Sequence, residues 1–135
     1  MKLLIDANIL LDVLQKREPH FESSSIVWKL CETNQAVGYV STLTFANIVY
    51  IMRKELTPDQ IEEVLHTLSL IFRFVECCEN DIKNAAEKHW DDFEDAIQSS
   101  IAERICVNCI ITRNVRDFKG SNVMALTPSE LIARI

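Results

Sequence analysis

The stretch KLLIDANILLDVL, residues 2–14, places a carboxylate inside an aliphatic run. Residues 2–5 are typical of a strand in the interior of a sheet, and Asp6 follows them directly. An ionised carboxylate that leaves water without a partner is strongly destabilising. Asp6 must therefore reach solvent or be compensated by a cation. Asp12 lies about one and two-thirds helical turns further on, off the face of Asp6, and is expected in solvent.

Short apolar runs alternate with segments of helical periodicity along the whole chain. A helix is expected over 43–54, and TPDQ (57–60) and TPSE (127–130) each start one with a Thr cap, a Pro and a Gln or Glu three residues after the cap. The expected strands are 2–5, 36–41, 109–112 and 122–126, with a weaker candidate around residue 75. This order predicts an α/β fold of three layers, with helices flanking a central parallel sheet of about five strands.

Length and composition indicate one ordinary globular domain. The chain has 135 residues, 48% of them hydrophobic, and residues 1–135 are expected to form a single domain. It contains no apolar run of about 18 residues that could span a membrane and no secretory signal, so the expected compartment is the cytoplasm. Two glycines are too few for a glycine-rich phosphate loop, which excludes P-loop and dinucleotide-binding proteins.

The five cysteines are expected to be reduced and mostly buried thiols. Cys106 and Cys109, in CVNC, have the spacing of a zinc knuckle or a redox pair. They lack a second pair and a nearby His, so buried thiols are the preferred interpretation.

Negative charge is concentrated in one segment. The net charge is −6, and eight acidic residues between Glu76 and Asp95 face only Lys83 and Lys88, which accounts for the whole excess. An acidic chain attracts a polyanion poorly through bulk charge, so a nucleic-acid substrate would require cations to mediate binding.

Polar side chains follow three of the expected strands, at the edge where open α/β sheets bind ligands. Asp6 ends the first strand, Asn47 lies in the helix after the second, and Asn114 and Asp117 follow the third clear strand. Because the carboxyl ends of parallel strands meet at one edge, we expect these side chains to converge. Asn8 is the expected cap of the helix after Asp6.

The segment HWDDFEDAIQSSIA, residues 89–102, begins a helix near Asp91 or Asp92. Asp91 and Glu94 are interpreted as a solvated acidic first turn, stabilised by the helix dipole. Asp95 is expected to face the sheet, because small and apolar residues follow it. Carboxylates gathered without Cys or His suit Mg²⁺ or Mn²⁺ rather than zinc, and such an ion can bind a phosphodiester and activate a water for attack.

Four segments together resemble one family, the PIN-domain ribonucleases, which include the VapC-type toxins of bacterial toxin–antitoxin pairs. They are LIDANILLDVL (4–14), VSTLTFANIVYIMRK (40–54), DDFEDAIQSSIAE (91–103) and IITRNVRDF (110–118). The resemblance implies a PIN-like fold and Mg²⁺- or Mn²⁺-dependent hydrolysis of RNA that leaves a 5′-phosphate. It also implies candidate partners: an RNA substrate, an antitoxin that inserts a basic segment across the acidic crevice, and a second copy of the chain.

The resemblance assigns roles to individual residues. The implied catalytic and metal-binding carboxylates are Asp6, Asp95 and Asp117, with Asn114 as the alternative for the last position. The second family position, normally a Glu, falls on Asn47, which offers a carbonyl oxygen but no negative charge. Asp92, one turn before Asp95, is the expected replacement and a further metal ligand.

Residues near these carboxylates have two interpretations each. Thr112 and Asn114 orient a water or a phosphate, or they form a turn. The basic residues Arg113, Arg116 and Lys119, with Arg53 at a helix end, contact RNA phosphates or belong to a solvated surface.

Two other functions compete with a metal-dependent endoribonuclease. Asn47 and the acidic surface are also compatible with a catalytically inactive PIN domain that binds RNA or a protein. A phosphoryl-handling protein of the receiver or haloacid-dehalogenase kind would use Asp6 as a nucleophile. The dehalogenase pattern requires a second Asp where Asn8 stands, and the receiver pattern places its acceptor Asp in mid-chain, so this third function is disfavoured.

Overall fold

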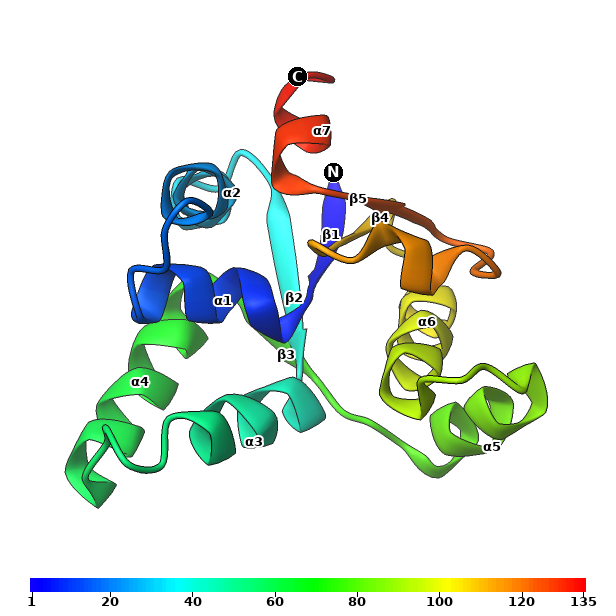
Figure 1. Ribbon diagram of the computed structural model, residues 1–135, viewed down its shortest axis with the longest axis horizontal. Coiled ribbons are helices and arrows are strands. Elements are labelled where there is room, and N and C mark those ends of the chain that lie inside the picture. Colours follow the sequence, from blue (N-terminus) through cyan, green and yellow to red (C-terminus); the bar gives the residue numbers. More distant parts are fainter.

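A parallel sheet of five strands runs through the computed structural model, which describes residues 1–135 (Figure 1). Its order is β3-β2-β1-β4-β5, and every neighbouring pair is parallel. The strands are β1 (Lys2–Ile5), β2 (Val37–Ser41), β3 (Arg73–Val75), β4 (Cys109–Ile111) and β5 (Met124–Leu126). The predicted three-layer α/β fold is confirmed, and the weak candidate near residue 75 is a real strand at the edge of the sheet.

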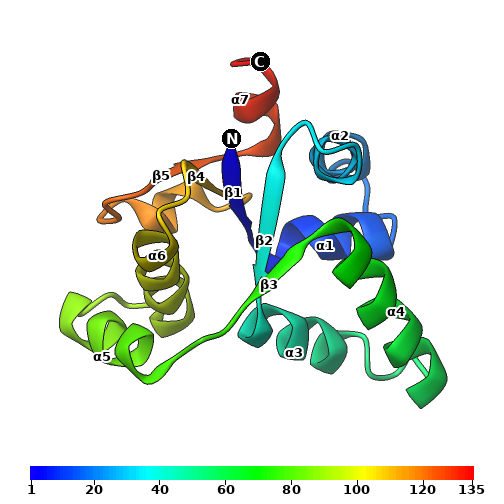
Figure 2. The same cartoon turned by 180° about the vertical axis from the view of Figure 1, so that it is seen from behind.

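Helices cover both faces of the sheet. In both views α1, α2, α3 and α4 lie on one side and α5 and α6 on the other (Figures 1 and 2). The helices are α1 (Ala7–Leu14), α2 (Phe21–Glu32), α3 (Thr42–Ile51), α4 (Pro58–Ile71), α5 (Glu79–Lys88), α6 (Phe93–Ile105) and α7 (Pro128–Ile132), with a 3₁₀ turn, η1 (Val115–Phe118). None of them has both the length and the apolar character needed to cross a membrane.

The central strand β1 explains why two cores form. Leu3 and Ile5 pack into the core beneath α1 to α4, whereas Leu4 packs into the core beneath α5 and α6. Side chains alternate between the two faces of a strand, so a strand covered on both faces must be apolar throughout. All three residues are fully buried.

The predicted helix starts are confirmed, with one correction at α1. Thr57 and Thr127 each form a complete capping box with the third helical residue. The predicted cap Asn8 is wrong, because Asp6 caps α1: its Oδ1 accepts the N–H of Ala7 at 2.8 Å. The helix follows the strand without a connecting loop, so Asn8 already lies inside it.

Asp12 is not solvated, contrary to the sequence prediction. It is completely buried, and its Oδ2 accepts a hydrogen bond from Ser24 Oγ at 2.9 Å and lies 3.3 Å from Arg113 Nε. The face of α1 opposite Asp6 packs against α2, which the spacing within α1 does not reveal. Asp12 is therefore a buried charge compensated by a cation.

None of the five cysteines forms a disulfide, and only some of them are buried. Cys109 is buried in β4, whereas Cys106 is exposed at the C-terminal end of α6, in the left-handed region with φ 57°. Burial raises the pKa of the Cys109 thiol, which disfavours the thiolate that zinc binding requires.

Candidate functional site

A cleft of about 370 Å³ lies at the carboxyl edge of the sheet. Residues from the end of β1, from α3, from the start of α6 and from the loop after β4 line it. We call it the acidic cleft, because its lining includes five carboxylates and no basic side chain: Asp6, Asp92, Glu94, Asp95 and Asp117. The predicted supporting residues Asn8, Asn47 and Asn114 line it as well.

Asp6 is held rigidly at the base of the acidic cleft. Its Oδ1 accepts the N–H of Ala7, and its Oδ2 accepts the hydroxyl of Thr112 at 2.8 Å. Burial raises the pKa of Asp6, although both hydrogen bonds oppose that shift. Thr112 Oγ1 also accepts the N–H of Asn114 at 3.1 Å. Thr112 thus both orients the carboxylate of Asp6 and closes the turn after β4.

Asp95 is surrounded by negative charge in the acidic cleft. Burial, and then the negative charges of Asp92 and Asp6, raise its pKa to about 7. Asp117 and Glu94 add smaller contributions of the same sign. A nearby cation would favour the charged form and reverse this shift.

Glu94 contacts Asn47, which the sequence prediction missed. Asn47 Nδ2 donates to Glu94 Oε1 at 2.7 Å. The carboxylate of Glu94 therefore lies beside the uncharged amide that occupies the second family position. Burial, followed by the charge of Asp6, raises the pKa of Glu94. Asp92, the expected replacement, caps α6 by accepting the N–H of Asp95 at 3.1 Å. No sequence pattern signals the contact between Glu94 and Asn47, because it depends on how α3 and α6 approach each other.

None of the predicted basic residues lines the acidic cleft itself. Arg113 lies against the buried Asp12, and Arg53 donates to the carbonyl of Tyr50 at 2.7 Å and covers its ring. Arg113 is thus paired with Asp12, and its role as an RNA contact stays a prediction. Arg116 and Lys119 line a neighbouring hollow that shares residues with the acidic cleft.

The acidic cleft fits a hard divalent cation in its donor chemistry. Its polar lining consists of carboxylates, side-chain amides and the hydroxyl of Tyr50, with no His or Cys. Mg²⁺ and Mn²⁺ prefer such oxygen ligands. No three of these side chains are close enough to chelate an ion as they stand.

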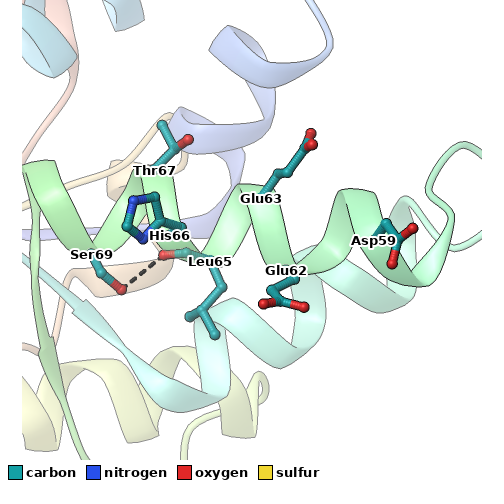
Figure 3. A pocket seen from close by; sticks show the side chains of 7 residues that line it. All are labelled: Asp59, Glu62, Glu63, Leu65, His66, Thr67 and Ser69. Atoms are coloured by element: carbon teal, nitrogen blue, oxygen red, sulfur yellow. Dashed lines mark hydrogen bonds between the residues drawn. The ribbon is translucent and has the colours of Figure 1, made fainter.

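A larger hollow, of about 820 Å³, lies along the surface of α4 (Figure 3). The side chains that line it all come from this one helix, and Figure 3 shows them spread along its length rather than converging. They are Asp59, Glu62, Glu63, Leu65, His66, Thr67 and Ser69. By volume alone this hollow would be the candidate functional site. Its side chains, however, do not converge on a common point, so we do not interpret it as one.

Comparison with known proteins identifies related sequences and folds. A family model described as a PIN domain matches residues 2–116. No curated protein matches the sequence. A toxin–antitoxin complex from Klebsiella pneumoniae aligns with a TM-score of 0.71 at 21% identity, over 93% of this chain and 97% of that chain. FitAcB from Neisseria gonorrhoeae aligns with a TM-score of 0.71 at 18% identity, over 94% and 98%. VapC20 from Mycobacterium tuberculosis, a Sarcin-Ricin loop cleaving toxin, aligns with a TM-score of 0.64 at 11% identity, over 80% and 86%. At these identities the likeness is one of fold.

Proposed function

Because the chain belongs to the PIN-domain family, we propose that it is a Mg²⁺- or Mn²⁺-dependent endoribonuclease that hydrolyses RNA phosphodiester bonds. The observation that carries this proposal is the convergence of five carboxylates in one cleft at the sheet edge. The raised pKa values of Asp6, Glu94 and Asp95, the last at about 7, support a site built around a cation.

In the proposed site Asp6, Asp95 and Asp117 hold the ion, and Glu94 supplies the charge that Asn47 lacks. When bound, Mg²⁺ or Mn²⁺ would offset the carboxylate charges and lower the pKa of the water that attacks phosphorus. Thr112 and the N–H of Ala7 keep the Asp6 carboxylate in one orientation. Asn47 does the same for Glu94 through the 2.7 Å hydrogen bond.

Asp92 has two proposed tasks. As the cap of α6 it fixes the first turn that carries Glu94 and Asp95. As a lining residue of the acidic cleft it adds negative charge beside Asp95, which strengthens the requirement for a cation.

We propose further that the chain is the toxin of a toxin–antitoxin pair. The Klebsiella pneumoniae structure is a toxin–antitoxin complex, and the Mycobacterium tuberculosis protein is a toxin that cleaves the Sarcin-Ricin loop. A basic antitoxin segment would be complementary to the acidic cleft. Co-purification with the product of an adjacent gene tests this part, and an RNA-cleaving chain that binds no such product would refute it.

A cleavage assay tests the nuclease proposal. The chain is incubated with a labelled RNA pool of random sequence in Mg²⁺ or Mn²⁺, and we expect cleavage that EDTA abolishes. Asp6→Asn, which keeps the shape of the side chain, should lower the rate by orders of magnitude. Asp59→Asn, on the remote surface of α4, is the matched control and should leave the rate unchanged. Metal-dependent cleavage that survives Asp6→Asn refutes the assignment.

A non-catalytic PIN domain is the second candidate, and the departure at Asn47 favours it. It predicts no cleavage of any RNA and no Mn²⁺ binding by calorimetry. Mn²⁺ binding that is lost in Asp6→Asn supports the nuclease instead, because the inactive domain would have no use for the ion.

A further inference from the structure

A second hollow, of about 330 Å³, adjoins the acidic cleft beside the start of α6 and η1. The two share Asp92 and Asp117 as lining residues. A linear ligand bound in the acidic cleft can therefore continue into the second hollow. We call it the donor hollow, because the residues that line this hollow but not the acidic cleft include several hydrogen-bond donors.

Those residues are rich in hydrogen-bond donors. Arg116 and Lys119 are exposed cations, and neither belongs to any of the ion pairs of the molecule. His89 lies beside them, and Asp91 is the one carboxylate not shared with the acidic cleft. The carboxylates thus concentrate on the shared side, while unpaired cations line the other.

Trp90 adds a directed donor to the donor hollow. Its ring meets Phe118 edge-on, with centroids 6.2 Å apart, and Lys88 Nζ lies 5.6 Å from the ring centroid. Trp90 lines the hollow, and its indole N–H forms no hydrogen bond within the protein. A Cβ on Gly120 would lie 3.1 Å from Trp90 Nε1, so the absence of a side chain there keeps this edge accessible.

We propose that the donor hollow binds a phosphate group of the RNA strand next to the nucleotides that occupy the acidic cleft. Guanidinium, ammonium and indole groups all donate to anionic oxygen and accept nothing, which matches a phosphodiester. Such contacts fix the register of a strand without reading its sequence. They also place two cationic donors beside the acidic cleft, which has none of its own. This inference rests on the proposed function, because it assumes an RNA substrate.

Binding of hexauridylate to the uncleaving Asp6→Asn chain tests the inference. Affinity is measured by fluorescence anisotropy at fixed Mg²⁺ and several salt concentrations. In that background Arg116→Ala/Lys119→Ala should reduce the slope of log affinity against log salt by about 0.7, the value for loss of one phosphate contact on a single strand. Lys29→Ala/Lys83→Ala removes the same charge from the surfaces of α2 and α5 and should change the slope little.

A second pair of variants tests the indole without changing any charge. Gly120→Ala places a methyl group against Trp90 Nε1 and should weaken hexauridylate binding several-fold. In a Trp28→Phe background, the emission of the remaining tryptophan, Trp90, should shift on binding.

Two results would overturn the inference. One is an equal loss of salt dependence in the double variant and in its charge-matched control. The other is unchanged affinity for hexauridylate with neutral methylphosphonate linkages. Neither result bears on the cleavage assay, which depends on Asp6, so failure of the donor hollow and failure of the nuclease can be told apart.

Discussion

Replacing Asp95 with Asn should stabilise the metal-free chain at pH 8 and should do so much less at pH 4. The pKa of Asp95 is raised from 3.8 to about 7, so the folded chain holds this proton more tightly than the unfolded chain does. A raised carboxyl pKa favours folding below the unfolded value, and that contribution is lost as the pH rises through about 7. Above it, the folded chain carries a repelled charge, which the substitution Asp95→Asn removes.

The magnitude follows from the shift and from the exposure of the group. A shift from 3.8 to about 7 corresponds to about 4 kcal/mol, at about 1.36 kcal/mol for each tenfold change. Asp95 is only partly buried, and solvent screening of a cleft residue reduces this to about 2 kcal/mol. The side chain of Asp95 donates and accepts no hydrogen bond whose loss would offset the gain.

Urea unfolding in EDTA at pH 4 and pH 8 measures this effect, because the free energy of unfolding extrapolates linearly to water. Asp59→Asn, on the surface of α4, is the control for removal of a carboxylate. Mn²⁺ should stabilise the parent chain at pH 8 and stabilise Asp95→Asn less. Equal effects of Asp95→Asn at the two pH values, or a loss of stability at pH 8, would refute the reasoning.

Three further substitutions have defined outcomes. Glu94→Gln keeps the contact with Asn47 but removes a charge, so calorimetry should show weaker Mn²⁺ binding without loss of folding; unchanged affinity would exclude Glu94 as a ligand. Gly38→Ala should cost about 1–3 kcal/mol in urea unfolding, because its Cβ would lie 2.7 Å from Phe72 Cδ1. Arg104→Met should cost about 3 kcal/mol, since it leaves the fully buried Asp81 without its 2.9 Å ion pair; a loss near zero would show that Asp81 is otherwise compensated.

Local sequence patterns were sufficient for the elements of the fold. The aliphatic runs at 2–5 and 109–112, and the Thr-Pro caps at 57–60 and 127–130, correspond to elements of the structure within one or two residues. These signals depend on neighbours in the chain, such as a Thr hydroxyl that meets the N–H three residues later. The order of strands and helices then limited the fold to a covered parallel sheet.

Asp12 and Glu94 mark the limit of that reasoning. Asp12 was expected in solvent, yet it is buried against Ser24. Glu94 is exposed as expected, but its contact with Asn47 across the acidic cleft was not foreseen. Helical spacing tells which residues share a face, but it does not tell what that face meets. A partner from a distant segment decided both cases.

By itself, the sequence determined the layer order, the helix starts and the placement of Asp6 at the end of a central strand, because strand periodicity and capping are properties of short segments. Only the tertiary structure decided which carboxylates share one cleft, that Glu94 accompanies Asn47, and that Arg113 compensates Asp12. Charge interactions depend on distance in space and on exclusion of water, and both arise only when α1, α3, α6 and the loop after β4 meet at the edge of the sheet.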